Sequence, residues 1–404
     1  MADVDILDVL LHHEPIGTLT RVGGDQTLFS FNDAYVADEN RPVLGLGFKD
    51  RLGGLISAFK PTRTRVIPFF SNLLPEGHLR NYLAERAGVN PAREFFLLWV
   101  LGADLPGAIT IRPADHQAWP PDESGADDDY HRRDNALRFS LAGMQLKLSA
   151  VMEAGGGLTI PARGIGGSWI VKLPSRQFAR VPENEFSMLT LARLSGMDVP
   201  AFELIDVAAI GNLPEGIGTV DGQALAIERF DRSPAGGAVH IEDFAQVFGV
   251  YPEDKYRRAR ARNIGAVIGA ECRADGVVEF IRRLTFNTLI GNSDMHLKNW
   301  SLIYPDRRHA ALAPAYDFVS TIAYLPDDRA ALKFSRTRRF SEFSEDELAH
   351  LAAKALLPEK LVLDVARETV ALFHQHWRGE RRHLPLAAEA TQAIAAHLQT
   401  IPIA

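Results

Sequence analysis

The sequence predicts an α+β protein with a small N-terminal module, a β-rich central lobe and a mainly helical C-terminal lobe. Three observations lead to this fold class. Short apolar stretches separated by turn residues fill positions 9–59 and recur between residues 150 and 230, a pattern typical of β-strands. Helical spacing of apolar residues dominates from residue 240 onward. An acidic segment at 120–135, nearly free of apolar residues, separates the two strand-rich parts.

The N-terminal module is expected over residues 1–119. Its strands are separated by turn signals such as Gly23-Gly24-Asp25. After Pro68 the spacing becomes helical, first over 79–87 and then over 91–101, where Pro91 suits the first turn of a helix. The following segment, 120–135, cannot bury a core and is predicted to be a solvated linker.

The β-rich lobe is expected over residues 136–231 and the helical lobe over 232–404. Strand-like stretches occur at 150–153, 158–160, 169–173 and 224–230, and one helix between Pro182 and Gly196 interrupts them. The helical lobe includes an apolar helix at 280–290 and two or three amphipathic helices between residues 345 and 401.

Composition limits the class of protein. Apolar residues make up 46% of the 404 positions, so the chain can bury a large core, and the net charge of −7 argues against a surface that binds nucleic acid throughout. The run 256–262 fits either a local basic patch or a solvated helix face. The single cysteine, the acidic residues within 1–8 and apolar runs far shorter than the ~20 residues of a membrane span predict a cytoplasmic protein without a membrane anchor.

The segment 292–299 carries the most chemical information. It lies between an apolar helix and a strand and contains Asp-x-x-x-x-Asn, formed by Asp294 and Asn299. In kinase catalytic loops this spacing lets the aspartate accept the proton of the attacking hydroxyl while the asparagine holds a metal ion. Lys298 could neutralise the transferring phosphoryl group. A structural turn with an Asx cap is the alternative reading.

A second acidic site follows across a predicted strand pair. Tyr316-Asp317-Phe318 is similar to the Asp-Phe-Gly metal site of kinases, with Val319 in place of the glycine. Two carboxylates, those of Asp294 and Asp317, and the amide of Asn299 could therefore converge on Mg²⁺.

Upstream residues could bind the nucleotide. Lys172 lies in an apolar strand, as a phosphate-binding lysine would, although an exposed edge-strand lysine is the alternative. Glu185 is its expected partner, with Glu183 as a rival. The loop 140–147, which has the single glycine Gly143, could present backbone amides to phosphate. The segment 228–230 fits a hinge that binds adenine and equally a plain connector. These elements follow the kinase order along the chain.

At these residues the sequence resembles the HipA family, the toxin kinases of bacterial toxin–antitoxin modules. The resemblance rests on the blocks 70–77, 140–147, 228–232, 294–299 and 314–317. It implies a two-lobed protein-kinase-like fold behind a small N-terminal module. The acidic linker and the apolar Met144 and Leu146 depart from the family pattern, which leaves target choice and regulation of the loop open.

The resemblance also implies roles for single residues and for partners. Asp294 would be the catalytic base, with Lys298 beside it, and Asn299 and Asp317 would hold Mg²⁺. The residues expected to contact ATP are Ser140, Gly143, Gln145, Lys147, Lys172, Glu228, Phe230 and His296. Ser140 would be an autophosphorylation site. The implied partners are a protein substrate, such as an aminoacyl-tRNA synthetase whose phosphorylation stops translation, and a helix-turn-helix antitoxin that links the kinase indirectly to DNA.

Two other functions remain open from the sequence. One is a kinase-like scaffold without phosphoryl transfer that acts as a corepressor with the antitoxin. The other is a small-molecule phosphotransferase, which would share the Asp-x-x-x-x-Asn spacing.

Overall fold

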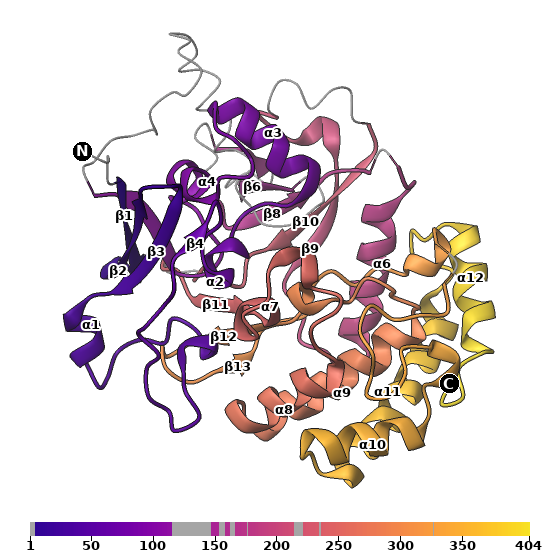
Figure 1. Ribbon diagram of the computed structural model, residues 1–404. Helices are drawn as coiled ribbons and strands as arrows, with labels where there is room; N and C mark the ends of the chain where they lie inside the picture. Colours follow the sequence, from indigo (N-terminus) through magenta and orange to yellow (C-terminus); the bar gives the residue numbers. More distant parts are fainter. Residues whose placement is uncertain are drawn as a thin grey trace.

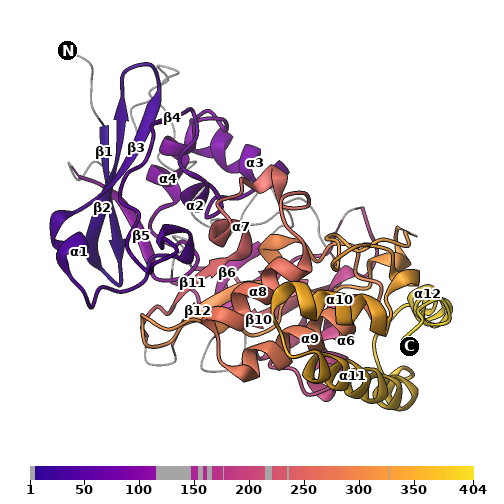
Figure 2. The same ribbon diagram turned by 60° about the horizontal axis from the view of Figure 1, so that its bottom comes forward.

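The computed structural model describes residues 5–114, 147–152, 158–161, 166–175, 177–213, 221–233, 236–325 and 327–404. A β-rich N-terminal module lies at one end of the molecule and a group of helices that contains the C-terminus lies at the other (Figure 1). Figure 2 shows the same separation from a second side. No helix in the described ranges is long and apolar enough to cross a membrane. The predicted linker 120–135 and the predicted loop residues Ser140, Gly143 and Gln145 lie outside those ranges.

The N-terminal module is built on a five-stranded antiparallel sheet with the order β4-β3-β2-β1-β5. Its strands are β1 (Asp5–Leu11), β2 (Glu14–Val22), β3 (Gln26–Phe31), β4 (Thr62–Arg63) and β5 (Ile109–Pro113). Its helices are α1 (Asp33–Ala37), α2 (Pro68–Ser71), α3 (Gly77–Ala87) and α4 (Glu94–Leu101).

Helix α4 begins later than the sequence predicts. The proline spacing predicts a start at residue 91, but residues 91–93 form a turn in which the Arg93 amide donates to the Asn90 carbonyl at 3.0 Å. Glu94 is buried and accepts hydrogen bonds from the Val66 amide at 3.0 Å and the Ser71 hydroxyl at 2.8 Å. These tertiary bonds fix Glu94 as the first helical residue.

A second five-stranded sheet forms the central lobe, with the order β7-β6-β8-β10-β9. The strands are β6 (Lys147–Met152), β7 (Leu158–Thr159), β8 (Trp169–Lys172), β9 (Phe202–Asp206) and β10 (Gln223–Glu228). Helix α6 (Val181–Leu194) lies between β8 and β9 along the chain, and Gly196 follows it with a φ of 81°. A positive φ of this kind suits glycine after the end of a helix.

The C-terminal lobe combines a small sheet with helices. The order of the sheet is β11-β12-β13, with β11 (His240–Asp243), β12 (Ser301–Tyr304) and β13 (Ala311–Leu312). The helices are α7 (Phe244–Val247), α8 (Ala261–Glu271), α9 (Ala274–Leu289), α10 (Glu345–Ala355), α11 (Glu359–Glu380) and α12 (Ala388–Leu398). The predicted α+β fold class, with strand-rich lobes before a helical one, is confirmed.

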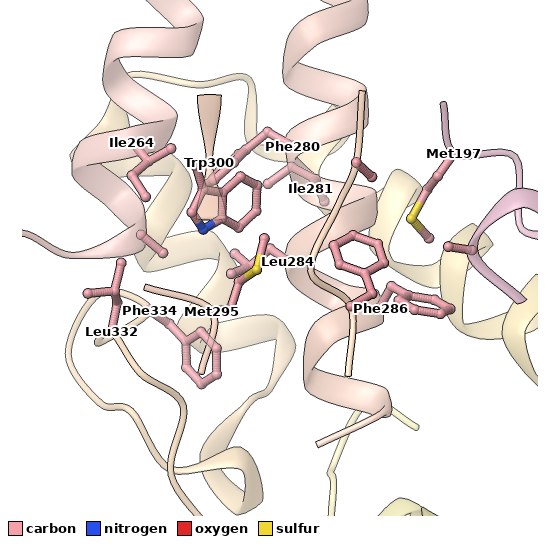
Figure 3. Packing of buried hydrophobic residues seen from close by; sticks show 14 of the residues in the cluster. Met197, Ile264, Phe280, Ile281, Leu284, Phe286, Met295, Trp300, Leu332 and Phe334 are labelled. Atoms are coloured by element: carbon pink, nitrogen blue, oxygen red, sulfur yellow. The ribbon is translucent and has the colours of Figure 1, made fainter. Parts of the chain in front are cut away.

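Buried side chains anchor the segment 292–299 in the helical lobe. Trp300 follows the segment directly and packs between Ile264 of α8 and Phe280 of α9, with 5.3 Å between the ring centroids of Trp300 and Phe280 (Figure 3). Met295 is buried in the same cluster, near Leu284. The loop that carries the predicted catalytic residues is therefore held by apolar packing at Met295 and directly after its last residue.

The N-terminal module does not have a core of its own. Its buried residues share one hydrophobic cluster with Leu148, Val171 and Ala226 of the central sheet. The module therefore packs directly on the lobe that carries Lys172, and movement of one would disturb the other.

Candidate functional site

Lys172, Glu185 and Asp317 meet in a buried ion cluster. Lys172 is only 3% exposed at the end of β8, and its Nζ lies 2.5 Å from Glu185 Oε1 on helix α6. The same ammonium group also bonds the Asp317 carboxylate. Glu183, the rival partner, pairs with Arg180 instead. Lys172 is thus a buried, paired lysine and not an exposed edge-strand residue.

Neighbouring charges favour the ionised forms of Asp317 and Lys172, whereas burial raises the pKa of Glu185. Burial raises the pKa of Asp317, but Lys147 and Lys172 outweigh it and hold that pKa well below its usual range. Burial lowers the pKa of Lys172, but Asp317 and Glu185 outweigh it and raise that pKa overall. Lys147 Nζ stands farther away, 3.9 Å from Asp317 Oδ2. Two lysines therefore face one aspartate at this site.

The backbone at Asp317 adopts an uncommon conformation. Its φ of 56° is in the left-handed region, which residues other than glycine adopt uncommonly, although aspartate and asparagine do so more often than most. The Asn292 side chain donates to the Asp317 carbonyl at 3.3 Å, and Phe318 is fully buried and stacked on Phe286. This conformation is held by tertiary contacts on both sides, as is common at functional sites.

Asp294 lies at the surface with its carboxylate fixed by neighbours. Its Oδ1 accepts a hydrogen bond from the Tyr256 hydroxyl at 2.5 Å, and its amide donates to the Asn292 side chain at 3.0 Å. The protein around it partly desolvates the carboxylate and raises its pKa, which the Tyr256 hydrogen bond opposes. Asn299 donates to the Asp294 carbonyl at 2.9 Å. Asp294 and Asn299 are thus tied into one rigid loop.

Lys298 contacts the N-terminal module, and its role beside the transferring phosphoryl group stays a prediction. Its Nζ lies 2.8 Å from Glu76 Oε1 and donates to the Asn72 carbonyl at 3.0 Å, both in the N-terminal module. Glu76 Oε2 binds a second lysine, Lys255, at 2.8 Å. Burial raises the pKa of Glu76, but Lys298 and Lys255 outweigh it and lower that pKa to about 2. One carboxylate of the N-terminal module therefore holds two lysines beside Asp294.

Sequence reasoning missed Glu76, Lys255 and Tyr256 as members of the site. Glu76 lies in the block 70–77, which carried only family resemblance, and Lys255 and Tyr256 border a basic run that resembles a solvated surface. No local pattern joins these positions, because their contacts depend on how the N-terminal module docks on the loop 292–299.

His296 is buried next to this group. Its ring meets that of Tyr256 edge to face, with centroids 5.0 Å apart, and burial together with the charge of Lys255 lowers its pKa to about 3. Its Nδ1 has no hydrogen-bond partner among the described residues. A neutral imidazole with an unused ring nitrogen could bond a ligand, so nucleotide contact by His296 stays a prediction.

The segment 228–232 contains a buried arginine that forms ion pairs and, beside it, two more exposed residues, Glu228 and Phe230. Arg229 is buried and pairs with Asp231 at 2.9 Å and with Asp104 of the N-terminal module at 3.1 Å. Glu228 is exposed, and the half-buried Phe230 ring lies 5.7 Å from that of Tyr316. The ion pairs join the predicted hinge to the N-terminal module, and an adenine contact at Glu228 or Phe230 stays a prediction.

The donor atoms fit magnesium. Asp317 offers an ionised carboxylate and Asn299 an amide oxygen, which are the hard oxygen ligands that Mg²⁺ prefers. The described residues contain no group of three or more His, Cys, Asp or Glu side chains that could hold a metal alone. Mg²⁺ usually takes few protein ligands and completes its shell with phosphate oxygens and water. Lys147 and Lys172, which lie beside Asp317, carry positive charges that could bind the phosphates of a nucleotide.

Comparisons with known proteins agree with this arrangement. The HipA N-terminal domain family matches residues 7–112, and the HipA-like C-terminal domain family matches residues 139–377. The chain belongs to the HipA family. The putative kinase Y4dM of Sinorhizobium fredii is 59% identical over 100% of this chain and 98% of the relative. The serine/threonine-protein kinase toxin HipA of Shewanella oneidensis is 27% identical over 65% of each chain.

A solved structure supports the fold. The complex of Shewanella oneidensis HipA, HipB and operator DNA contains a chain that is similar with a TM-score of 0.72 and 21% identity. The match covers 98% of this chain and 95% of the other. At this identity the likeness concerns the fold alone, and it confirms the two-lobed, kinase-like architecture predicted for a HipA family member.

Proposed function

We propose that this HipA family protein is an ATP- and Mg²⁺-dependent serine/threonine protein kinase that acts as the toxin of a toxin–antitoxin module. The observation that carries the proposal is the buried Lys172–Glu185–Asp317 cluster next to the loop of Asp294 and Asn299. Kinases need a phosphate-binding lysine held by a glutamate together with metal-binding residues and a base, and these residue types are gathered here.

In this mechanism Asp294 accepts the proton of the substrate hydroxyl. Its raised pKa makes it a stronger base than an aspartate of ordinary pKa, and the hydrogen bond from Tyr256 orients the carboxylate. Lys147 and Lys172 would bind phosphate oxygens. Mg²⁺, held by Asn299 and Asp317, would neutralise charge on the phosphates of ATP.

The substrate and partners are inferred from relatives. The name of the Shewanella relative supports transfer to serine or threonine, and the assembly of its structure supports a HipB-like helix-turn-helix antitoxin that brings DNA to the complex. A translation component such as an aminoacyl-tRNA synthetase is the proposed target. Autophosphorylation is proposed at Ser140.

The test uses purified protein, labelled ATP and host lysate. Wild-type protein should label one or a few proteins on serine or threonine, whereas Asp294→Asn should label none while binding ATP with near wild-type affinity in calorimetry. Asp306→Asn, which changes an exposed loop aspartate, serves as the control and should keep full activity. Full activity in Asp294→Asn would show that Asp294 is not the catalytic base. Absence of labelling by wild-type protein would favour the corepressor scaffold.

A further inference from the structure

The side chain of Asn184 joins helix α6 to the segment that follows Asp317. Asn184 is 1% exposed and directly precedes Glu185 in the helix. Its side-chain amide group donates to the Ser320 carbonyl at 3.1 Å, and its side-chain oxygen accepts a hydrogen bond from the Ser320 backbone amide at 3.0 Å. One buried side chain therefore satisfies both backbone polar groups of Ser320, which is itself fully buried.

This contact closes a ring with the ion cluster. Ser320 follows Asp317 closely in the chain, and the Asp317 carboxylate bonds the ammonium group of Lys172. Lys172 in turn pairs with Glu185, the neighbour of Asn184. Helix α6 is thus tied to the Asp317 segment twice, once through Lys172 and once through Asn184. A shift of the helix relative to that segment must break one of these ties.

Tyr324 strengthens the connection at the start of helix α6. Its hydroxyl accepts a hydrogen bond from the Asn184 amide group at 3.2 Å and donates to the Arg180 carbonyl at 3.4 Å. Its ring packs against that of Phe178, with the ring centroids 5.3 Å apart. The first turn of α6 and the residues just before it therefore contact one continuous segment, 320–324.

The segment 320–324 also contacts the chain next to the predicted catalytic base. The Thr321 hydroxyl donates to the Gly291 carbonyl at 3.1 Å and accepts a hydrogen bond from the Ser293 amide at 2.7 Å. The Ile322 amide donates to the same Gly291 carbonyl at 3.3 Å. The segment is therefore held both by helix α6 and by the start of the loop 292–299.

Asparagine suits position 184 because its side chain ends in both a donor and an acceptor. Aspartate could still accept from the Ser320 amide, but its second oxygen would face the Ser320 carbonyl and add negative charge beside Glu185. Alanine would leave the buried amide and carbonyl of Ser320 without these partners, which costs free energy because both groups are shielded from water. The hydrogen bonds thus depend on the amide side chain.

We propose that Asn184 is a positioning residue of the kinase, which holds helix α6 where Glu185 reaches Lys172 and thereby sets the affinity for ATP with Mg²⁺. The inference deepens the proposed function and rests on it, because it needs Lys172 and Asp317 to bind the nucleotide and its metal ion. Protein kinases require the lysine–glutamate pair and the metal-binding aspartate to be in place together, and phosphorylation often controls this. Here a neutral side chain and backbone groups make the connection, so the pair forms without a phosphate group.

The experiment measures the Kd of ATP in the presence of Mg²⁺ by calorimetry and the Tm of every variant. Asn184→Ala should raise this Kd about tenfold, because a displaced Glu185 no longer orients Lys172. The matched control is Ser187→Ala, which removes a buried hydroxyl of the same helix that donates to the Glu183 carbonyl at 2.6 Å. The control should lower the Tm and leave the Kd unchanged.

A milder variant covers the case in which Asn184→Ala does not fold. Tyr324→Phe keeps the ring on Phe178 and removes the hydroxyl that bonds Asn184 and Arg180. It should raise the Kd about threefold, since it weakens the connection without breaking the contacts of Ser320. A Kd that stays at the wild-type value in Tyr324→Phe and in folded Asn184→Ala would overturn the positioning role.

A cycle with Glu185→Gln separates positioning from a general loss of structure. In the Glu185→Gln background the ionic tie to Lys172 is already removed, so adding Asn184→Ala should change the Kd by less than about twofold. A tenfold effect that persists there, or that Ser187→Ala reproduces, would overturn the positioning role and leave the kinase intact. Failure of the wild-type protein to bind ATP would instead overturn the proposed function, and with it the role of Asn184.

Discussion

Glu76→Gln tests whether the N-terminal module is part of the catalytic apparatus. The change removes the one negative charge that Lys255 and Lys298, whose side chains are 6% and 8% exposed, share among the described residues. Relative to an ordinary value of 4.5, a pKa of about 2 for Glu76 corresponds to about 3 kcal/mol of stabilisation, at about 1.36 kcal/mol per unit. Breaking a buried ion pair costs a similar ~3–5 kcal/mol.

Thermal unfolding measures this loss of stability. With an unfolding entropy of about 2.1 cal/mol/K per residue over 404 residues, 3 kcal/mol corresponds to a Tm lower by roughly 4 °C. Because the pKa of Glu76 is depressed in the folded state, its stabilising effect is complete above pH ~4.5 and is lost as the pH falls toward 2. The difference in stability between wild type and Glu76→Gln should shrink over that window.

Catalysis should fall in the same variant. Lys298 belongs to the catalytic loop and Lys255 precedes Tyr256, which holds Asp294, so loosening both should lower kcat about tenfold or more with less effect on the KM for ATP. The matched control is Glu271→Gln, which breaks the Lys49–Glu271 pair between the module and α8 at 2.9 Å. That pair is exposed, so its loss should lower the stability by less than ~1 kcal/mol.

Two outcomes would refute this reasoning. One is a Glu76→Gln protein as stable and active as Glu271→Gln, which would mean that the buried lysines do not need their carboxylate. The other concerns the double variant Glu76→Gln with Lys255→Met. It removes one of the two unpaired charges and should recover part of the lost stability. A further fall in Tm would show that packing, and not charge, explains the single variant.

Three further predictions follow from the site. Asp317→Ala should erase the extra thermal stabilisation that ATP gives with Mg²⁺ over ATP with chelator, and equal shifts for wild-type protein in the two buffers would contradict metal binding there. Tyr256→Phe removes a hydrogen bond that lowers the pKa of Asp294, so the acid limb of the kcat profile should move to higher pH; an unmoved limb would separate Tyr256 from the base. Phosphorylation of Ser140 should weaken ATP binding through charge repulsion, measured by calorimetry on phosphorylated and bare protein separated after mass spectrometric mapping.

The elements that depend on local sequence could be predicted. Alternating apolar residues set the strands, proline and glycine set the ends of α6, and the spacing between Asp294 and Asn299 placed both in one loop. The buried position of Lys172 was indicated by its apolar neighbours, since a charged residue in such a strand needs a partner. Each of these features is encoded by residues close together in the chain.

Tertiary structure decided which distant charges meet. The ammonium group of Lys298 donates to the carbonyl of Asn72, 226 residues away, and shares Glu76 with Lys255. No spacing rule connects these positions in the sequence. It also decided that residues 256–260 precede α8 and that Tyr256 bonds Asp294. The physical reason is that periodicity and turn residues act over a few positions, whereas ion pairing depends on which surfaces are brought together when the N-terminal module packs on the loop 292–299.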